Sequence, residues 1–121
     1  MVPLLQFCVL CDSIAQSPDG KPTFVGVFDG LKKPGTVPQF SIALRWCNGL
    51  GKFKTTLRLL RPNLEELIPR MENEFELRNR VQNATGYFVL VNLQFSESGV
   101  YWMEISLDDE IAASVPFSVF S

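Results

Sequence analysis

Two short clusters in the sequence have the residue types that redox chemistry or metal binding would need. Asp108, Asp109 and Glu110 offer consecutive carboxylates, whose oxygens are the ligands that Ca²⁺ prefers. Cys8 and Cys11 have the C-x-x-C spacing of redox and zinc sites. The chain has no histidine, so both clusters lack the commonest general base and metal ligand of proteins.

Neither cluster has the sequence context of such a site. Three consecutive acids between two alternating segments are typical of a two-residue hairpin turn, whereas a calcium loop spaces its acids around a glycine. We interpret residues 108–110 as a turn, with a weak cation site as the alternative. Cys8 and Cys11 lie in the strand-like run "LLQFCVLC", where residues three apart point to opposite faces. We therefore expect buried or edge thiols and no cofactor.

Composition excludes several classes of protein. The 121 residues are 46% hydrophobic, enough for a core without disulfides or metals, and the net charge of −2 offers no basic surface for nucleic acid. No apolar run approaches the ~20 residues of a membrane span. The N-terminal residues lack the features of a signal peptide, and three cysteines do not form the framework of a secreted domain. We expect a cytoplasmic protein that binds neither nucleic acid nor membrane.

Apolar and polar residues alternate with the period of β-strands along most of the chain. Strands are expected at 4–11, 23–30, 39–47, 52–60, 71–78, 86–95, 99–107 and 110–120. The turn formers at 17–22 and the hairpin signal "NGLG" at 48–51 separate neighbouring strands. Segment 61–70 is bracketed by two prolines, which leaves room for at most one short helical turn near 63–68. The sequence predicts one all-β domain over residues 1–121, an antiparallel β-sandwich of about seven to nine strands.

The run "SESGVYWMEI" resembles the corner before the penultimate strand of immunoglobulin-like domains, where a tyrosine hydroxyl ties back the chain. Gly99 and Tyr101 match that corner, and Met103 stands where such domains have a disulfide cysteine. Trp46 resembles their core tryptophan. The resemblance implies an immunoglobulin-like sandwich with the first, second, sixth and fifth expected strands in one sheet. The eighth, seventh, third and fourth would form the other.

Three stretches together are similar to an uncharacterised bacterial family of small cytoplasmic proteins, a domain of unknown function. They are "FCVLCD", "PDGKPTFVGVFDGL" and "ESGVYWMEISLDDEIAASVPFSV". The similarity spans nearly the whole chain. It implies the fold and a prokaryotic source, and it supplies no functional residues.

The immunoglobulin-like mapping predicts two surface patches. The first is apolar and comes from three neighbouring strands, with Phe24, Phe28, Tyr87, Val89 and Val91 pointing inward. The residues expected to point outward are Leu4, Leu10, Val25, Val27, Phe88 and Leu90. An exposed apolar patch of this size usually marks an interface. The alternative is that segment 61–70 covers the patch through Leu64, Leu67 and Ile68.

The second patch combines an aromatic residue with cations. Trp102 would share the outer face of its sheet with Arg45, Arg58 and Lys54, and could stack on a sugar, a base or a partner side chain. The alternative is that the arginine stems merely cover the indole ring.

These features favour a non-enzymatic module that binds a protein partner or itself, as a homo-oligomer, because no histidine and no recognisable catalytic motif is present. A small-ligand or carbohydrate-binding domain that uses Trp102 is the second reading. Catalysis by Asp and Glu alone is the third.

Overall fold

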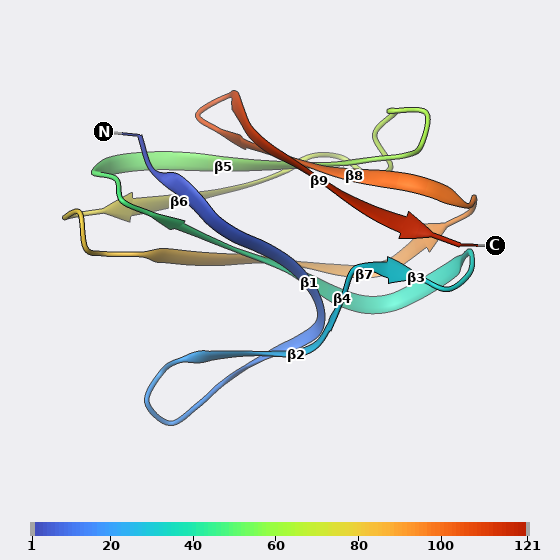
Figure 1. Ribbon diagram of the computed structural model, residues 1–121, viewed down its shortest axis with the longest axis horizontal. Coiled ribbons are helices and arrows are strands. Elements are labelled where there is room, and N and C mark those ends of the chain that lie inside the picture. The colour runs from blue at the N-terminus through green and yellow to red at the C-terminus, as the bar shows by residue number, and fades with distance from the viewer. Residues whose placement is uncertain (1, 121) are drawn as a thin grey trace.

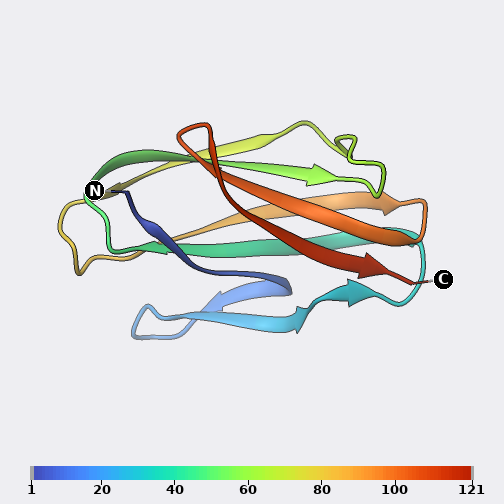
Figure 2. The ribbon, with the colours of Figure 1, turned by 45° about the horizontal axis from the view of Figure 1, so that its top comes forward.

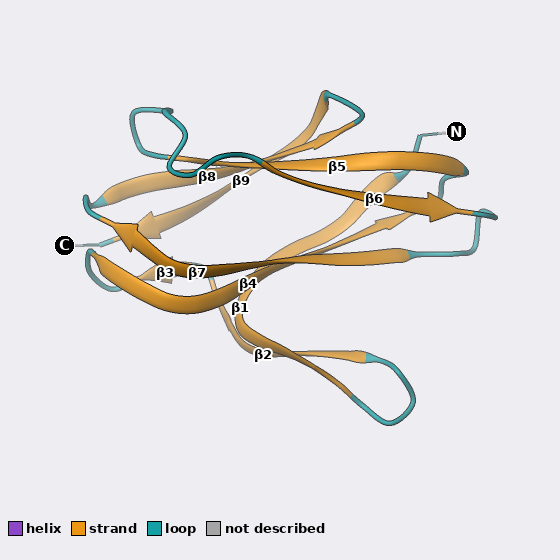
Figure 3. Cartoon of the chain, turned by 180° about the vertical axis from the view of Figure 1, so that it is seen from behind, coloured by secondary structure: helices purple, strands orange, loops and turns teal. Residues whose placement is uncertain are grey.

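The chain folds into two β-sheets that face each other, as the sequence predicts (Figure 1). The computed structural model describes residues 2–120. Its nine strands are β1 (Leu4–Gln16), β2 (Pro22–Phe28), β3 (Gly30–Leu31), β4 (Gly35–Cys47), β5 (Gly51–Leu60), β6 (Met71–Leu77), β7 (Ala84–Phe95), β8 (Gly99–Leu107) and β9 (Glu110–Val119). Between residues 2 and 120 only strands, turns and loops occur (Figure 3).

The strand order differs from the immunoglobulin-like mapping. One sheet has the antiparallel order β2-β1-β4-β7, and the other has the order β3-β9-β8-β5-β6, in which only β3 and β9 run parallel (Figure 2). β4 was expected beside β5 and β8, but it pairs with β1 and β7. β6 was expected in the sheet of β1 and β2, but it forms a hairpin with β5. The mapping was wrong because adjacent chain segments do not have to enter the same sheet.

The "NGLG" segment shows how this error arose. It was predicted to close a hairpin between 39–47 and 52–60, but it carries the chain from one sheet to the other. Asn48 has a φ of 58° and Gly51 a φ of 124°, so residues tolerant of positive φ are needed here as in a hairpin. Gly49 lies so close to the chain start that a Cβ there would be 2.7 Å from the Cβ of Pro3. The turn residues therefore predicted correctly that the chain bends here. The prediction that the strands before and after the bend pair with each other was wrong.

The core lies between the sheets and consists of the alternate residues of each strand. β4 contributes four large side chains to this core, Phe40, Ile42, Leu44 and Trp46. The indole N–H of Trp46 donates a hydrogen bond to the hydroxyl of Thr55 on β5, at 2.9 Å, and so joins the two sheets inside the core. The same indole stacks on Phe75 of β6, with 5.9 Å between ring centroids.

The corner before β8 has the contact that the resembling motif implies. The hydroxyl of Tyr101 donates a hydrogen bond to the carbonyl of Glu97, at 2.9 Å, while its ring packs against Phe95 and Phe117. Gly99 has a φ of 137°, and a Cβ there would be 2.9 Å from Cγ of Pro62. Glycine is therefore required at this position by both the backbone conformation and the available space.

Segment 61–70 is an irregular loop, and the short helical turn that seemed feasible near 63–68 does not form. The amide of Leu64 donates to the carbonyl of Arg61, Leu64 has a φ of 71°, and Leu60 forms an isolated bridge with Glu66. The amide of Leu67 donates to the carbonyl of Leu59. The loop thus folds back on the end of β5, which satisfies its backbone without a helix.

The β1–β2 hairpin extends beyond the rest of the four-stranded sheet (Figure 1). β1 pairs with β4 through residues 4–11 and with β2 through residues 10–16, so the outer half of the hairpin has no third strand beside it. Gly26 has a φ of 68° and faces Asp12 so closely that a Cβ would overlap that carboxylate. Phe24 packs edge-on against Phe7, with 5.7 Å between centroids. These features position the hairpin tip relative to the sheet.

Candidate functional site

The acidic cluster is a hairpin turn, as predicted. Asp108 and Asp109 have φ values of 47° and 69°, and they connect Leu107 to Glu110, which are paired in the sheet. The carboxylate of Asp108 accepts a hydrogen bond from the amide of Lys54 at 2.8 Å, and the ammonium of Lys54 lies 3.4 Å from Asp109. Two of the three acids therefore bind protein groups. Over residues 2–120, no group of three or more His, Cys, Asp or Glu side chains is arranged to hold a metal ion.

The two cysteines of the C-x-x-C run are not a reactive pair. Cys8 packs against the sandwich core, and burial raises its pKa to about 11. Cys11 is fully buried, and its pKa is also raised, mainly by burial and further by the nearby charge of Asp12. All three cysteines are free thiols. A raised pKa keeps a thiol protonated near neutral pH, which is the opposite of what redox chemistry requires.

The predicted patch around Trp102 is split between the two sheets. Trp102, Arg58 and Lys54 lie on β8 and β5 of the five-stranded sheet, whereas Arg45 lies on β4 of the other sheet. Trp102 is half-buried and lines a shallow cavity of about 500 Å³ together with Arg58 and Leu64. The prediction that Arg45 belongs to this patch was wrong, because it depended on pairing β4 with β5.

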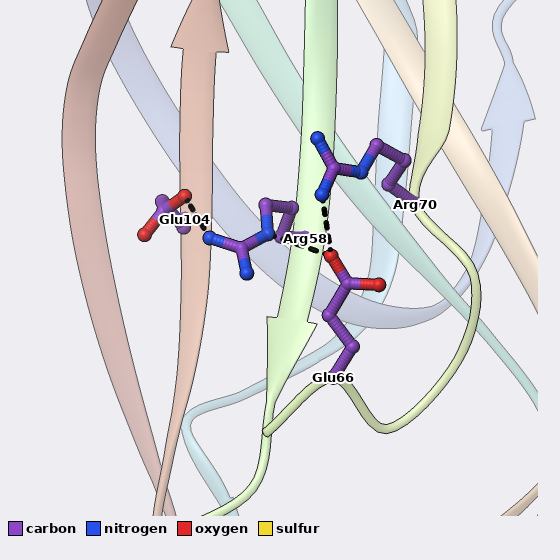
Figure 4. Close-up of polar contacts among 4 residues, drawn as sticks. All are labelled: Arg58, Glu66, Arg70 and Glu104. Carbon is purple, nitrogen blue, oxygen red and sulfur yellow. Dashed lines mark hydrogen bonds and ion pairs between the residues drawn. The ribbon is translucent and has the colours of Figure 1, made fainter. Parts of the chain in front are cut away.

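The guanidinium of Arg58 is already occupied by two carboxylates (Figure 4). Its Nε lies 2.8 Å from Oε1 of Glu66, and its Nη1 lies 2.7 Å from Oε1 of Glu104. Arg70 reaches the same Glu66 oxygen at 2.9 Å. These hydrogen bonds raise the pKa of Arg58 and lower that of Glu66. The network fastens loop 61–70 to the five-stranded sheet and leaves Arg58 little capacity for an added anion.

Half of the predicted apolar interface belongs to the core. Leu10, Phe88 and Leu90 are only 4%, 6% and 4% exposed. Leu4, Val25 and Val27 are exposed as expected, and so are Tyr87, Val89 and Val91, which were expected to point inward. The prediction for 86–95 was wrong because both alternate sets are apolar, so periodicity could not distinguish inside from outside. The set that contains Phe88 and Leu90 points into the core. There, Phe88 is paired with Ile42 and Leu90 with Phe40 on the neighbouring strand β4.

The exposed set forms an outer apolar face on the four-stranded sheet. We use this name for Val25, Val27, Tyr87, Val89 and Val91. One row of paired residues, Val27–Cys11–Ser41–Val89, crosses all four strands; the valines at its two ends are exposed, whereas Cys11 and Ser41 between them are buried. Loop 61–70 does not cover this face, as the alternative proposed, because it is attached to the other sheet.

Arg45 lies in a second cavity that the sequence did not reveal. This cavity, about 340 Å³, lies between the β1–β2 hairpin tip and the start of β7. Its lining residues are Gln16, Gly20, Pro22, Arg45, Asn83, Thr85 and Tyr87. The Nε of Arg45 donates to the hydroxyl of Thr85 at 2.8 Å, and its guanidinium carbon lies 5.2 Å from the ring centroid of Phe7. No local sequence signal brings residues 16–22 beside residues 83–87, because the contact depends on how far the hairpin extends.

Fold and surface together define an all-β protein of two facing sheets, with one exposed apolar face and a separate arginine-containing cavity. The chain belongs to a family of unknown function (DUF6941), whose sequence profile matches residues 6–120. None of the curated proteins matches it. Within residues 2–120, no helix is long and apolar enough to cross a membrane.

Proposed function

We propose that this protein is a non-enzymatic interaction module that pairs with a second copy of itself through the edge of β7. The observation that carries the proposal is the lack of any charge, proline or bulge between Tyr87 and Val91 on that edge. The exposed edge of a β-sheet presents unpaired N–H and C=O groups to other chains, and proteins protect such edges with charges, prolines, bulges or very short strands.

The other exposed edges of this protein have such protection. They are interrupted by the bulge between Leu5 and Phe7 in β1, the positive-φ Gly26 in β2, Pro38 in β4, the two-residue β3 and Pro116 along β9, and the glutamates Glu72, Glu74 and Glu76 in β6. Each device either removes a backbone donor, distorts the strand or adds charge.

β7 differs from these edges in composition and regularity. It has no charged residue and no proline. It pairs regularly with β4 from Ala84 to Val91, and Asn92, with a φ of 51° opposite Pro38, ends that regular part. At its start the Asn73 side chain of β6 lies against Gly86. This leaves Tyr87–Val91 as an accessible, uncharged edge, although the strand was expected to lie in the middle of a sheet.

A second copy is the partner that suits this edge best. Antiparallel pairing of two β7 strands about a two-fold axis brings no like charges together and joins the two four-stranded sheets into one. It also brings Val89 and Val91 of each copy side by side. The outer apolar faces of both copies would then form a single surface with a smaller exposed perimeter.

The free cysteines and the family resemblance support a reducing, intracellular and bacterial setting for this module. Tyr101 and Trp46 support a relationship to immunoglobulin-like domains. Three free cysteines suit the cytoplasm, where thiols stay reduced, and the family resemblance suggests a bacterial source. The Tyr101 corner and the buried Trp46 support the immunoglobulin-like relationship, although the strand order departs from the expected mapping.

Light scattering coupled to size exclusion tests the pairing. The unaltered protein is expected to run as a dimer whose population rises with concentration, and Val89→Lys is expected to shift it to the monomer. Val27→Lys is a matched control, since Val27 is 60% exposed and Val89 54%, on opposite edges of the same sheet. A monomer at every concentration overturns self-association. Equal dissociation by both substitutions would instead assign the contact to the outer apolar face.

A second candidate function rests on Trp102. Its half-buried ring lines the 500 Å³ cavity beside Leu64, which is 62% exposed, so a sugar ring or another small ligand could stack there. A thermal-shift screen against sugars tests this function. The expected result is a stabilisation that Trp102→Ala removes, and equal shifts in both proteins would exclude the site.

A further inference from the structure

We infer that the cavity between the β1–β2 hairpin tip and the start of β7 binds a small oxyanion, a carboxylate or phosphate group, through the guanidinium of Arg45. This inference does not depend on self-association, because it concerns a different group of residues and predicts binding by a single chain.

The side chain of Arg45 is held in place before any ligand arrives. It is partly buried, its Nε donates to Thr85, and its guanidinium lies over the Phe7 ring at 5.2 Å. The four N–H groups on its Nη1 and Nη2 have no hydrogen-bond acceptor, and no carboxylate lies within ion-pair distance, among residues 2–120. Fixing a side chain in advance lowers the entropic cost of binding.

Arg58 provides an internal comparison. It is partly buried like Arg45 and also lies on the outer face of a sheet, but its guanidinium contacts two carboxylates. Removing a cation from water is unfavourable unless an anion or several acceptors compensate. The protein supplies those anions at Arg58 and supplies only a neutral hydroxyl and an aromatic ring at Arg45.

The residues around Arg45 are also suited to an anion. None of the seven lining residues is acidic, although the chain has 13 Asp and Glu residues and a net charge of −2. Gln16, Asn83 and Tyr87 offer further hydrogen-bond donors, while Pro22 provides an apolar surface. The volume of about 340 Å³ is near the lower end of small-molecule sites, which begin at about 300 Å³.

Charge and geometry define the class of ligand. A guanidinium presents two parallel N–H donors, which match the two oxygens of a carboxylate or phosphate. The mixed polar and apolar lining suits a compact organic acid or phosphate ester. The structure contains no positive surface beyond Arg45 in this cavity, so an extended polyanion is a poorer match.

Amide chemical shifts measured by NMR during titration test the inference. Inorganic phosphate and benzoate are the two probes, with sodium chloride at equal ionic strength as the reference, because salt screens weak ion pairs. Saturable shifts are expected at the non-proline residues of 16–22 and at 83–87, and are expected to be absent with chloride. The probe that saturates at the lower concentration identifies the preferred oxyanion. Shifts that stay linear, or that chloride reproduces, overturn the inference.

Charge variants connect the response to Arg45. Arg45→Gln is expected to weaken binding at least tenfold, and Arg45→Lys, which keeps the charge but loses the paired donors, is expected to weaken it less. Arg61→Gln is the matched control, since Arg61 has no ion pair among residues 2–120 and lies in the loop on the other sheet. Equal weakening by Arg61→Gln would assign the effect to net charge. If Arg45→Gln does not fold, unchanged affinity in Arg45→Lys would contradict paired-donor recognition. The same titration on Val89→Lys separates binding from dimerisation.

Discussion

The hydrogen bond between Trp46 and Thr55 predicts that a threonine-to-valine substitution destabilises the protein at position 55 and does not destabilise it at position 56. Thr55→Val removes the acceptor of the buried indole N–H. Thr56→Val removes a hydroxyl that is also buried but has no hydrogen-bond partner. The two threonines are 1% and 5% exposed and follow one another on β5, so shape, strand propensity and burial are nearly matched.

The magnitudes follow from the cost of an unpaired polar group. A buried donor without an acceptor costs about 1–3 kcal/mol, so Thr55→Val is expected to lower the free energy of unfolding by that amount. Thr56→Val removes an existing penalty, so the same free energy is expected to stay constant or rise by up to about 1 kcal/mol. An unfolding entropy of about 2.1 cal/mol/K per residue over 121 residues converts each kcal/mol into about 4 °C of Tm.

Urea titration followed by circular dichroism measures both free energies, and a thermal melt measures both Tm values. Thr55→Val is expected to melt about 4–12 °C below the unaltered protein, and Thr56→Val at or above it. In a Trp46→Phe background the indole donor is absent, so most of the difference between the two valine variants should disappear. Equal destabilisation by both substitutions in the unaltered background would refute the reasoning.

Three further predictions concern the corner, the ion-pair network and the thiols. Gly99→Ala should lower the free energy of unfolding by about 1–3 kcal/mol, because its φ of 137° and the contact with Pro62 both exclude a Cβ. Gly35→Ala is the control in urea titrations, since a Cβ at Gly35 would meet open space. Equal losses of stability in the two variants would contradict this account. The lowered pKa of Glu66 means that its stabilising effect is complete above the usual carboxyl pKa and is lost as pH falls through the lowered value. The protection of loop 61–70 against hydrogen exchange, measured relative to the intrinsic rate at each pH, should therefore fall in acid. An identical loss of protection in Glu66→Gln would oppose this. Because burial raises the pKa of Cys8 to about 11, its thiolate fraction at pH 7.5 is about 100-fold lower than in the unfolded chain, and thiol reagents should label it correspondingly more slowly in the native state. Equal labelling rates in the native and unfolded protein would disagree.

The sequence predicted the strands that have one apolar face better than those that have two. In β4, β5 and β8 only one alternate set is apolar, and residues such as Phe40, Leu57 and Met103 are buried as expected. In β7 both sets are apolar, and a shift of one residue exchanges the core with the surface. Packing against β4 decided this phase, and the sequence of β7 alone does not contain that information.

Sheet membership and the candidate sites were less predictable for a related reason. Turn residues define where the chain bends, and the "NGLG" bend would look the same whether it led to a paired strand or to the other sheet. Arg45 was therefore assigned beside Trp102, and the cavity that it lines with the hairpin tip was missed. The acidic turn was predicted correctly because a two-residue hairpin depends only on local conformation.

In the proposed self-association through β7, the unequal protection of the sheet edges would limit the number of molecules that strand pairing joins. An open chain of subunits needs two adhesive edges on each molecule, one to receive a neighbour and another to present to the next. Prolines, bulges and glutamates interrupt the remaining edges of residues 2–120, so a molecule paired at β7 would offer no equally unprotected second edge there for a further molecule. The same arrangement that exposes β7 would therefore favour closed dimers over fibres.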